Sequence, residues 1–160
     1  MRHTISCTAR NRPGVLAKIA GAFADRDINI HSLAVNEAEG EAVSRITVVI
    51  ECEDADIEAI AEDTSKLEDV VAVEDLDRSG FLDRELLLAK VNSAAADLPR
   101  LMQIVEVMRA SVVAISHDDM TIEMTGTEER ISAFVSLLKP FGITECARSG
   151  RVAVSAGELW

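Results

Sequence analysis

Residues 11–16, Asn-Arg-Pro-Gly-Val-Leu, connect the first alternating run of the chain to its first amphipathic run. Pro13 fits the first turn of a helix, where a missing N–H costs nothing, and Gly14 removes a Cβ that would keep another group away from the backbone. Free amides at a helix N-terminus favour a carboxylate or phosphate, and the Asn11 side chain offers both donors and an acceptor. The stretch predicts a strand-to-helix turn that can receive an amino acid. The alternative is an ordinary turn in which Asn11 only caps the helix.

The first half of the chain reads as strand, helix, strand, strand, helix, strand. Residues 3–9 alternate as a half-buried strand does, and the apolar residues after Gly14 recur at helical spacing. The second strand carries Ile30, Leu33 and Val35 as its apolar residues, around an irregularity. The expected strands are residues 3–9, 29–35, 43–51 and 70–73, and residues 37–41 are expected to form a loop. Asp54 is expected to cap the second helix. The first helix should bury Val15, Leu16, Ile19, Ala20 and Phe23, and the second helix Ile57, Ile60, Ala61, Thr64 and Leu67. This order is the ferredoxin-like arrangement.

The same order begins again after residues 77–80, so the chain has an internal repeat of about 80 residues. The expected strands are residues 85–91, 112–115, 120–125 and 143–148, and the helices follow the caps Asp97 and Thr127. At 160 residues, the chain is long enough for two small domains. We predict an α+β protein of two tandem ferredoxin-like (βαββαβ) domains, residues 1–78 and 79–160. Each is small and exposes sheet edges, so pairing with a second copy is expected.

The composition argues against several classes of partner. A formal net charge of −12 repels phosphate backbones and anionic lipid. No apolar run approaches the roughly 20 residues that cross a bilayer, and the first residues lack a signal-peptide pattern. Cys7, Cys52 and Cys146 are far apart, which argues against a disulfide framework or a zinc site. We expect a cytoplasmic protein that binds neither nucleic acid nor membrane.

No sequence pattern for catalysis is present. The histidines, His3, His31 and His117, are not at a metal-binding spacing, and the sequence has no nucleophile elbow, Gly-x-Gly-x-x-Gly or Walker motif. Neighbouring acidic residues such as Asp118 and Asp119 are typical of solvated turns. We therefore expect a binding or regulatory chain with no catalytic residue and no metal site of its own.

Motifs along the whole chain resemble those of one family. They are Asn11-x-Pro-Gly14-Val-Leu, Gly21-x-Phe23, Asn29-Ile30-x-Ser32-Leu33-x-Val35 and Ser44-Arg45-Ile46-Thr47, followed by Asp83-Arg84-Glu85-Leu86, Leu88-x-Lys90, Thr125-Gly126-Thr127 and Ala147-Arg148-Ser149-Gly150. The first domain resembles an ACT domain, a small amino-acid-sensing module. The chain as a whole is similar to the small regulatory subunits of acetolactate synthase (acetohydroxyacid synthase).

The resemblance implies a regulatory function. Such subunits form homodimers through their ACT domains and bind a branched-chain amino acid, valine above all, at the interface. They activate a separate large catalytic subunit and confer feedback inhibition in valine, leucine and isoleucine biosynthesis. Thiamine diphosphate, Mg and FAD are expected in that large subunit, with no cofactor on this chain. By matching position, the effector-binding residues are Asn11, Gly14, Val15 and Leu16 from one protomer, and Asn29 and Ile30 from the other.

Two other functions remain open on the sequence. One is a free-standing ACT-type amino-acid sensor that regulates transcription or another biosynthetic enzyme, and a co-purifying large subunit would argue against it. The other is a small enzyme that uses the open face of a sheet, which turnover by the isolated chain would reveal.

Overall fold

The computed structural model describes residues 1–38, 42–93 and 97–157. The chain forms two compact units. Unit 1 contains Met1–Leu82 and the segment from Arg151 onward, and unit 2 contains Asp83–Gly150. The chain therefore leaves unit 1 between Leu82 and Asp83 and returns to it at Arg151. Each unit is described separately below.

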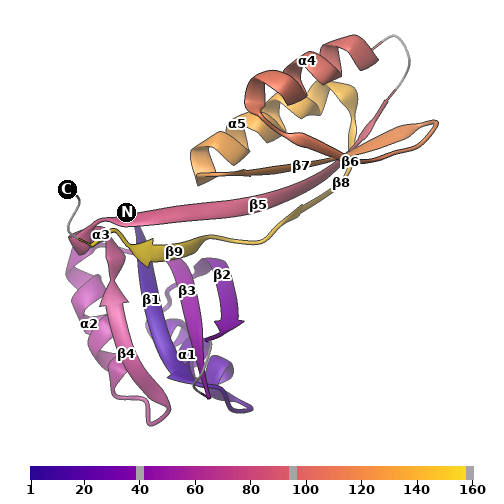
Figure 1. The fold of residues 1–160 in the computed structure, drawn as a ribbon. Coiled ribbons are helices and arrows are strands. Elements are labelled where there is room, and N and C mark those ends of the chain that lie inside the picture. Colours follow the sequence, from indigo (N-terminus) through magenta and orange to yellow (C-terminus); the bar gives the residue numbers. More distant parts are fainter. Residues whose placement is uncertain (39–41, 94–96, 158–160) are drawn as a thin grey trace. The chain divides into compact units, whose positions relative to one another are not determined.

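Unit 1 is an antiparallel sheet in the strand order β2-β3-β1-β4, with α1 and α2 on one face (Figure 1). This order and the antiparallel pairing confirm the ferredoxin-like prediction for the first half of the chain. Its elements are β1 (Arg2–Arg10), α1 (Val15–Ala24), β2 (Ile30–Glu37), β3 (Val43–Glu51), α2 (Asp54–Ser65), β4 (Val70–Asp75), the short α3 (Leu76–Ser79) and β9 (Val152–Ser155).

The core of unit 1 lies between the sheet and its two helices. Burial of each large side chain there contributes about 1.5–3 kcal/mol to stability, so the helices are held mainly by packing. The buried residues of this core are Ile5, Cys7, Ala9, Val15, Ile19, Phe23, Ile46, Val48, Ile50, Ile57 and Ile60. They occupy every second position along β1 and β3 and most of the helical stripes that the sequence predicts. The prediction is wrong for Leu16, which is 40% exposed.

Strand β2, the start of α2 and the loop after β2 can be compared with the sequence predictions in detail. The β2 strand has the expected irregularity, a register shift between Ile30 and Ser32, but Leu33 and Val35 are 36% and 45% exposed. Leu33 and Val35 pair with Val48 and Ile46 of the core, so they lie on the face that the helices cover, and they are exposed because β2 is the edge strand of the sheet. Helix α2 begins at Asp54, with Glu53 as its N-cap, so Asp54 is one residue too late to cap it. Part of the predicted loop at residues 37–41 lies outside the described residues.

The second face of the unit 1 sheet is also covered. Thr4 and Ser6 are 1% and 5% exposed, and Arg151 and Ala153 are buried as well. The Arg151 guanidinium donates to Thr4 Oγ1 at 2.7 Å, and its backbone N–H donates to Ser32 Oγ at 2.9 Å. The segment at Arg151 therefore lies on the side of the sheet opposite the helices, an arrangement that the sequence did not predict.

Unit 2 repeats the fold with the strand order β6-β7-β5-β8 and its own core. Its elements are β5 (Phe81–Asn92, which starts in unit 1), α4 (Leu98–Met108), β6 (Ser111–Ile115), β7 (Asp119–Gly126), α5 (Glu128–Leu138), the 3-10 turn η1 (Lys139–Phe141) and β8 (Ile143–Arg148). The largest buried side chains include Leu87, Leu101, Ile122, Ile131 and Phe134. The second ferredoxin-like repeat is thus confirmed. None of the helices described in either unit is both long and apolar enough to cross a membrane.

Candidate functional site

The turn between β1 and α1 has a defined backbone geometry. The Val15 N–H donates to the Arg12 carbonyl at 3.3 Å, with Pro13 and Gly14 at the two central positions. Gly14 has φ +86° and ψ −10°, the values of the third residue of a type II turn, which favours Pro before it. Because a residue with positive φ cannot be helical, α1 starts only at Val15. The prediction that Pro13 lies in the first helical turn is therefore wrong by two positions.

The start of α1 offers backbone donors. The first helical hydrogen bond runs from the Lys18 N–H to the Gly14 carbonyl, so the amides of Leu16 and Ala17 have no partner within the helix. The N-cap is Gly14, which makes no side-chain cap, so Asn11 does not occupy the capping position that the alternative interpretation required. These amides, together with the dipole of the helix, suit an anionic group.

The same turn is open to solvent. Asn11, Gly14 and Leu16 are exposed, whereas Val15 is buried in the core and anchors the turn. A Cβ built on Gly14 meets no atom within 4 Å. A ligand can therefore approach the backbone here without displacing protein atoms. Four of the six predicted effector residues lie together in this turn.

The other two predicted residues, Asn29 and Ile30, lie at the opposite end of the sheet. Arg10, just before the turn, pairs with Val43 at the start of β3, whereas Ile30 pairs with Ile50 near its end. Seven positions of extended strand separate those two partners, which is about 23 Å. Within one chain, the two predicted halves of the site are therefore far apart.

A buried carboxylate holds two cations beside the turn. Asp69 is 7% exposed, and its side chain lies 3.0 Å from Lys18 Nζ and 3.5 Å from Arg12 Nη1. The hydrogen bond from Lys18 lowers the pKa of Asp69, as do the charges of Lys18, Arg12 and Arg10. Two cations against one carboxylate leave this region net positive. The sequence did not reveal Asp69, because 51 residues separate it from Lys18.

In unit 2, two of the motifs that carried the family resemblance, Asp83-Arg84-Glu85-Leu86 and Ala147-Arg148-Ser149-Gly150, lie against each other. The Arg148 side chain from β8 donates to Glu85 of β5 through Nε at 2.9 Å. Ser149 and Leu86 exchange hydrogen bonds, from the Ser149 N–H to the Leu86 carbonyl and from the Leu86 N–H to Ser149 Oγ. Glu85 is 5% exposed. This polar cluster fixes the pairing of β5 with β8 and is structural.

Comparisons with known proteins agree with this architecture. Residues 5–72 match the family model of the AHAS small subunit-like ACT domain, and residues 84–157 match that of the small subunit of acetolactate synthase. The chain is 40% identical to the acetolactate synthase small subunit of Bacillus subtilis, over 98% of this chain and 92% of that protein. It is 39% identical to that of Mycolicibacterium smegmatis, over 97% and 91%.

A solved structure gives the same result for the fold. The acetolactate synthase small subunit from Thermotoga maritima superposes with a TM-score of 0.92 at 34% sequence identity, covering 99% of both chains. The likeness therefore extends beyond the ACT domain of unit 1 to unit 2.

Proposed function

Since the chain belongs to the family of acetolactate synthase small subunits, we propose that it binds a branched-chain amino acid, valine above all, between two ACT domains. Bound there, the effector imposes feedback inhibition on a large catalytic subunit that this chain otherwise activates. The observation that carries the proposal is the Arg12–Val15 turn, with its open left-handed Gly14 in front of α1. Asn11, Gly14, Val15 and Leu16 supply one half of the site.

The chemistry of the turn fits the polar end of an amino acid. The amides at the start of α1 can donate hydrogen bonds to a carboxylate, and the net positive charge of Arg12 and Lys18 against Asp69 adds to that attraction. The Asn11 side-chain oxygen is an acceptor for the ammonium group. Leu16 is 40% exposed and offers apolar surface to a branched side chain.

The topology of unit 1 supports a second copy as the source of Asn29 and Ile30. The β2 strand is an edge of the sheet, and its last residue, Glu37, pairs with Ser44, at the same end of the sheet as the β1-to-α1 turn. If β2 pairs antiparallel with β2 of another copy about a two-fold axis, the start of one strand lies beside the end of the other. Asn29 and Ile30 of the second copy then come to the end of the sheet that carries the turn. Such pairing also covers the exposed edge.

Inhibition then follows from a coupling free energy. The effector contacts both protomers and favours one arrangement of the paired ACT domains, whereas the catalytic subunit prefers another. Couplings of this kind are typically about 1–3 kcal/mol. In this proposal the catalytic residues, thiamine diphosphate, Mg and FAD belong to the large subunit, and the complex works in the cytoplasm.

The effector site is tested by calorimetry and by inhibition of the assembled enzyme. The full chain should release heat and gain thermal stability with valine, leucine or isoleucine, and a null result with all three contradicts the effector site. A purified acetolactate synthase large subunit should bind the chain and become more active. Failure of that subunit to bind would favour a free-standing sensor.

Gly14→Asp should abolish inhibition while leaving activation intact, because a carboxylate there crowds and repels the effector without touching unit 2. The matched control is Gly80→Asp. Gly80 also has a positive φ, +72°, and open space at its Cβ position. Its ψ of +146° lies close to a region essentially restricted to glycine, so an Asp there is strained at least as much, away from the turn. Full inhibition of the Gly14→Asp enzyme would place the effector elsewhere.

A further inference from the structure

His3, on β1 in unit 1, is buried without satisfying its imidazole. The residue is 8% exposed, and neither ring nitrogen has a hydrogen-bond partner in the structure. Nε2 lies 3.2 Å from Asp54 Oδ1, but without the geometry of a hydrogen bond. Buried polar groups are nearly always satisfied, and an exception points to a water, an ion or a functional role. The proposed effector site does not use His3.

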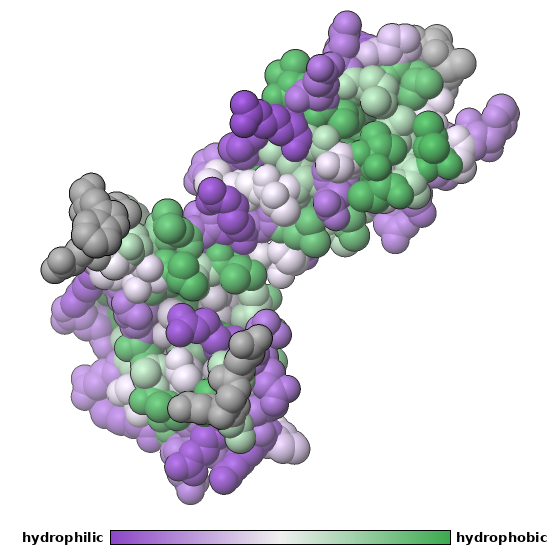
Figure 2. Space-filling view, viewed as in Figure 1, coloured by the Kyte–Doolittle hydropathy of each residue, from purple (hydrophilic) through white to green (hydrophobic). Residues whose placement is uncertain are grey.

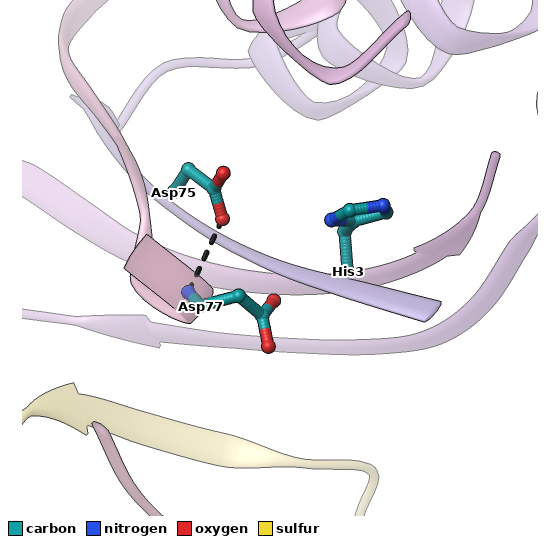
Figure 3. A group of neighbouring side chains, drawn as sticks. All are labelled: His3, Asp75 and Asp77. Carbon is teal, nitrogen blue, oxygen red and sulfur yellow. Dashed lines mark hydrogen bonds between the residues drawn. The ribbon is translucent and has the colours of Figure 1, made fainter. Parts of the chain in front are cut away.

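Two further carboxylates lie beside this imidazole. One ligand atom each from His3, Asp75 and Asp77 lie within 4.8 Å of one another. Figure 3 shows the three side chains where β1 passes the junction of β4 and α3. The Asp75 side chain is 12% exposed, whereas Asp77 is exposed. The cluster therefore has two protected ligands and one that opens to solvent.

Backbone donors already orient both carboxylates. The Thr4 N–H donates to Asp77 Oδ2 at 2.6 Å, and the Asp77 N–H donates to Asp75 Oδ1 at 3.2 Å. Each carboxylate keeps its second oxygen for another partner, and for Asp75 this oxygen lies 3.3 Å from Arg78 Nε. Hydrogen bonds that hold ligand side chains in place are a regular feature of metal sites.

We propose that His3, Asp75 and Asp77 form a binding site for a divalent transition-metal ion, with Zn²⁺ as the best match. One imidazole nitrogen and two carboxylate oxygens are ligands that Zn²⁺ accepts, whereas Ca²⁺ and Mg²⁺ prefer oxygen alone. The two carboxylates balance the charge of the ion. In a tetrahedral zinc site the ligand atoms lie about 3.4 Å apart, so small side-chain rotations complete the site, with water at the position that Asp77 leaves open.

The expectation of no metal site rested on spacing along the sequence. His3 lies 72 positions before Asp75, and no local motif connects them; the antiparallel pairing of β1 with β4 brings them together. An ion bound here joins the start of β1 to the β4-to-α3 junction and stabilises unit 1 by binding only its folded state. This proposal is independent of the effector site.

The test is calorimetric titration of the full, chelator-treated chain with Zn²⁺ alone near neutral pH. We expect one ion per chain and a higher thermal midpoint. His3→Gln and Asp77→Asn should each weaken binding by more than about tenfold, since even indirect partners of a metal commonly matter that much. His31→Gln is the matched control, because His31 also pairs with a carboxylate, Glu51 at 3.1 Å, and this variant should bind as tightly as the wild type.

Two further measurements separate ligation from structural damage. Arg78→Gln removes the cation that competes for Asp75, so it should bind Zn²⁺ more tightly, an effect that a purely structural role would not produce. With Co²⁺ as the probe, the absorption spectrum should lack a thiolate charge-transfer band; such a band would assign the ion to a cysteine such as Cys52. Absence of saturable Zn²⁺ binding, or wild-type affinity in Asp77→Asn, would overturn the proposal even if His3→Gln fails to fold.

Discussion

Units 1 and 2 have the same βαββαβ order, but the connection from the first strand to the first helix differs. In unit 1 it contains Gly14 with positive φ and an open approach to the helix start. In unit 2 the N-cap of α4 is Asp97, with right-handed helical backbone angles, and Pro99 lies in the first turn of the helix. The hydrophobic periodicity therefore determines the shared fold, whereas a single backbone conformation leaves one turn open in front of its helix.

The outer faces of the two sheets differ as well. In unit 1, Thr4 and Ser6 are buried on the face that Arg151 contacts. In unit 2, the side chains of β5 that point away from the core, Leu86 and Leu88, are 36% and 40% exposed. Apolar residues are visible on the surfaces of both units (Figure 2). The same topology can thus expose apolar sheet surface in one unit and cover polar sheet surface in the other.

The largest predicted effect tests whether the two cores are independent. Phe23 and Phe134 are both fully buried, each in its own core. Phe23→Ala and Phe134→Ala should each destabilise the affected unit by about 3–5 kcal/mol, through lost burial and the cavity left behind. Hydrogen exchange read by mass spectrometry should show faster exchange in the mutated unit alone. Equal loss of protection in both units would mean that they unfold as one.

A smaller effect is expected at Arg151, which follows unit 2 in the sequence but belongs to unit 1. Arg151→Met should destabilise unit 1 by about 1.5–3 kcal/mol, the range for hydrogen bonds of charged groups, because Thr4 loses a buried donor. Faster exchange of the β1 amides is the measurement. Arg130→Met in unit 2 is the control; its exposed bond to the Met108 carbonyl should be worth less than about 0.5 kcal/mol. Unchanged β1 protection in Arg151→Met would contradict the assignment of this segment to unit 1.

The smallest predicted effect is a change in thermal stability that depends on pH. The folded-state pKa of Asp69 is lowered, mainly by the hydrogen bond from Lys18. The ionised side chain therefore stabilises the folded state fully above the ordinary Asp pKa of about 4, and this stabilisation is lost as the pH falls through the lower, folded-state pKa. Asp69→Asn should reduce the melting temperature above that range, and the difference from the wild type should vanish in acid. The exposed Lys90–Glu145 pair of unit 2 provides the comparison, because Glu145→Gln should change stability less.

Much of the fold follows from sequence alternation. The strands predicted at residues 43–51 and 143–148 have the same bounds in the structure, because strict alternation or an apolar run, bounded by turn residues, leaves few alternatives. The return of the chain at Arg151 was not predictable in this way. The strand β9 is four residues long and mostly exposed, and it pairs with β5. The contacts with β1 and β2 come from Arg151 just before it, and such polar contacts have no periodic signature.

The candidate site could be predicted only where its residues are neighbours in the sequence. Residues 11–16 form a turn at the start of α1, as their composition predicts, although Gly14 moves the helix start past Pro13. Asp69 was missed because its partners lie more than fifty positions away. The effector roles of Asn29 and Ile30 stay a prediction, since the pairing of edge strands that would bring them to the turn involves a second chain.

The return of the chain at Arg151 also affects the order in which the units can fold during synthesis. Domains usually fold as they leave the ribosome, the N-terminal one first. Here, all residues of unit 2 are synthesised before unit 1 is complete, since unit 1 includes the segment from Arg151 onward. Thr4 and Ser32 therefore gain their contacts with Arg151 only after residues 83–150 have been made. A nascent chain that stops at Leu82 therefore contains every strand of the first sheet and still lacks the segment that covers its outer face.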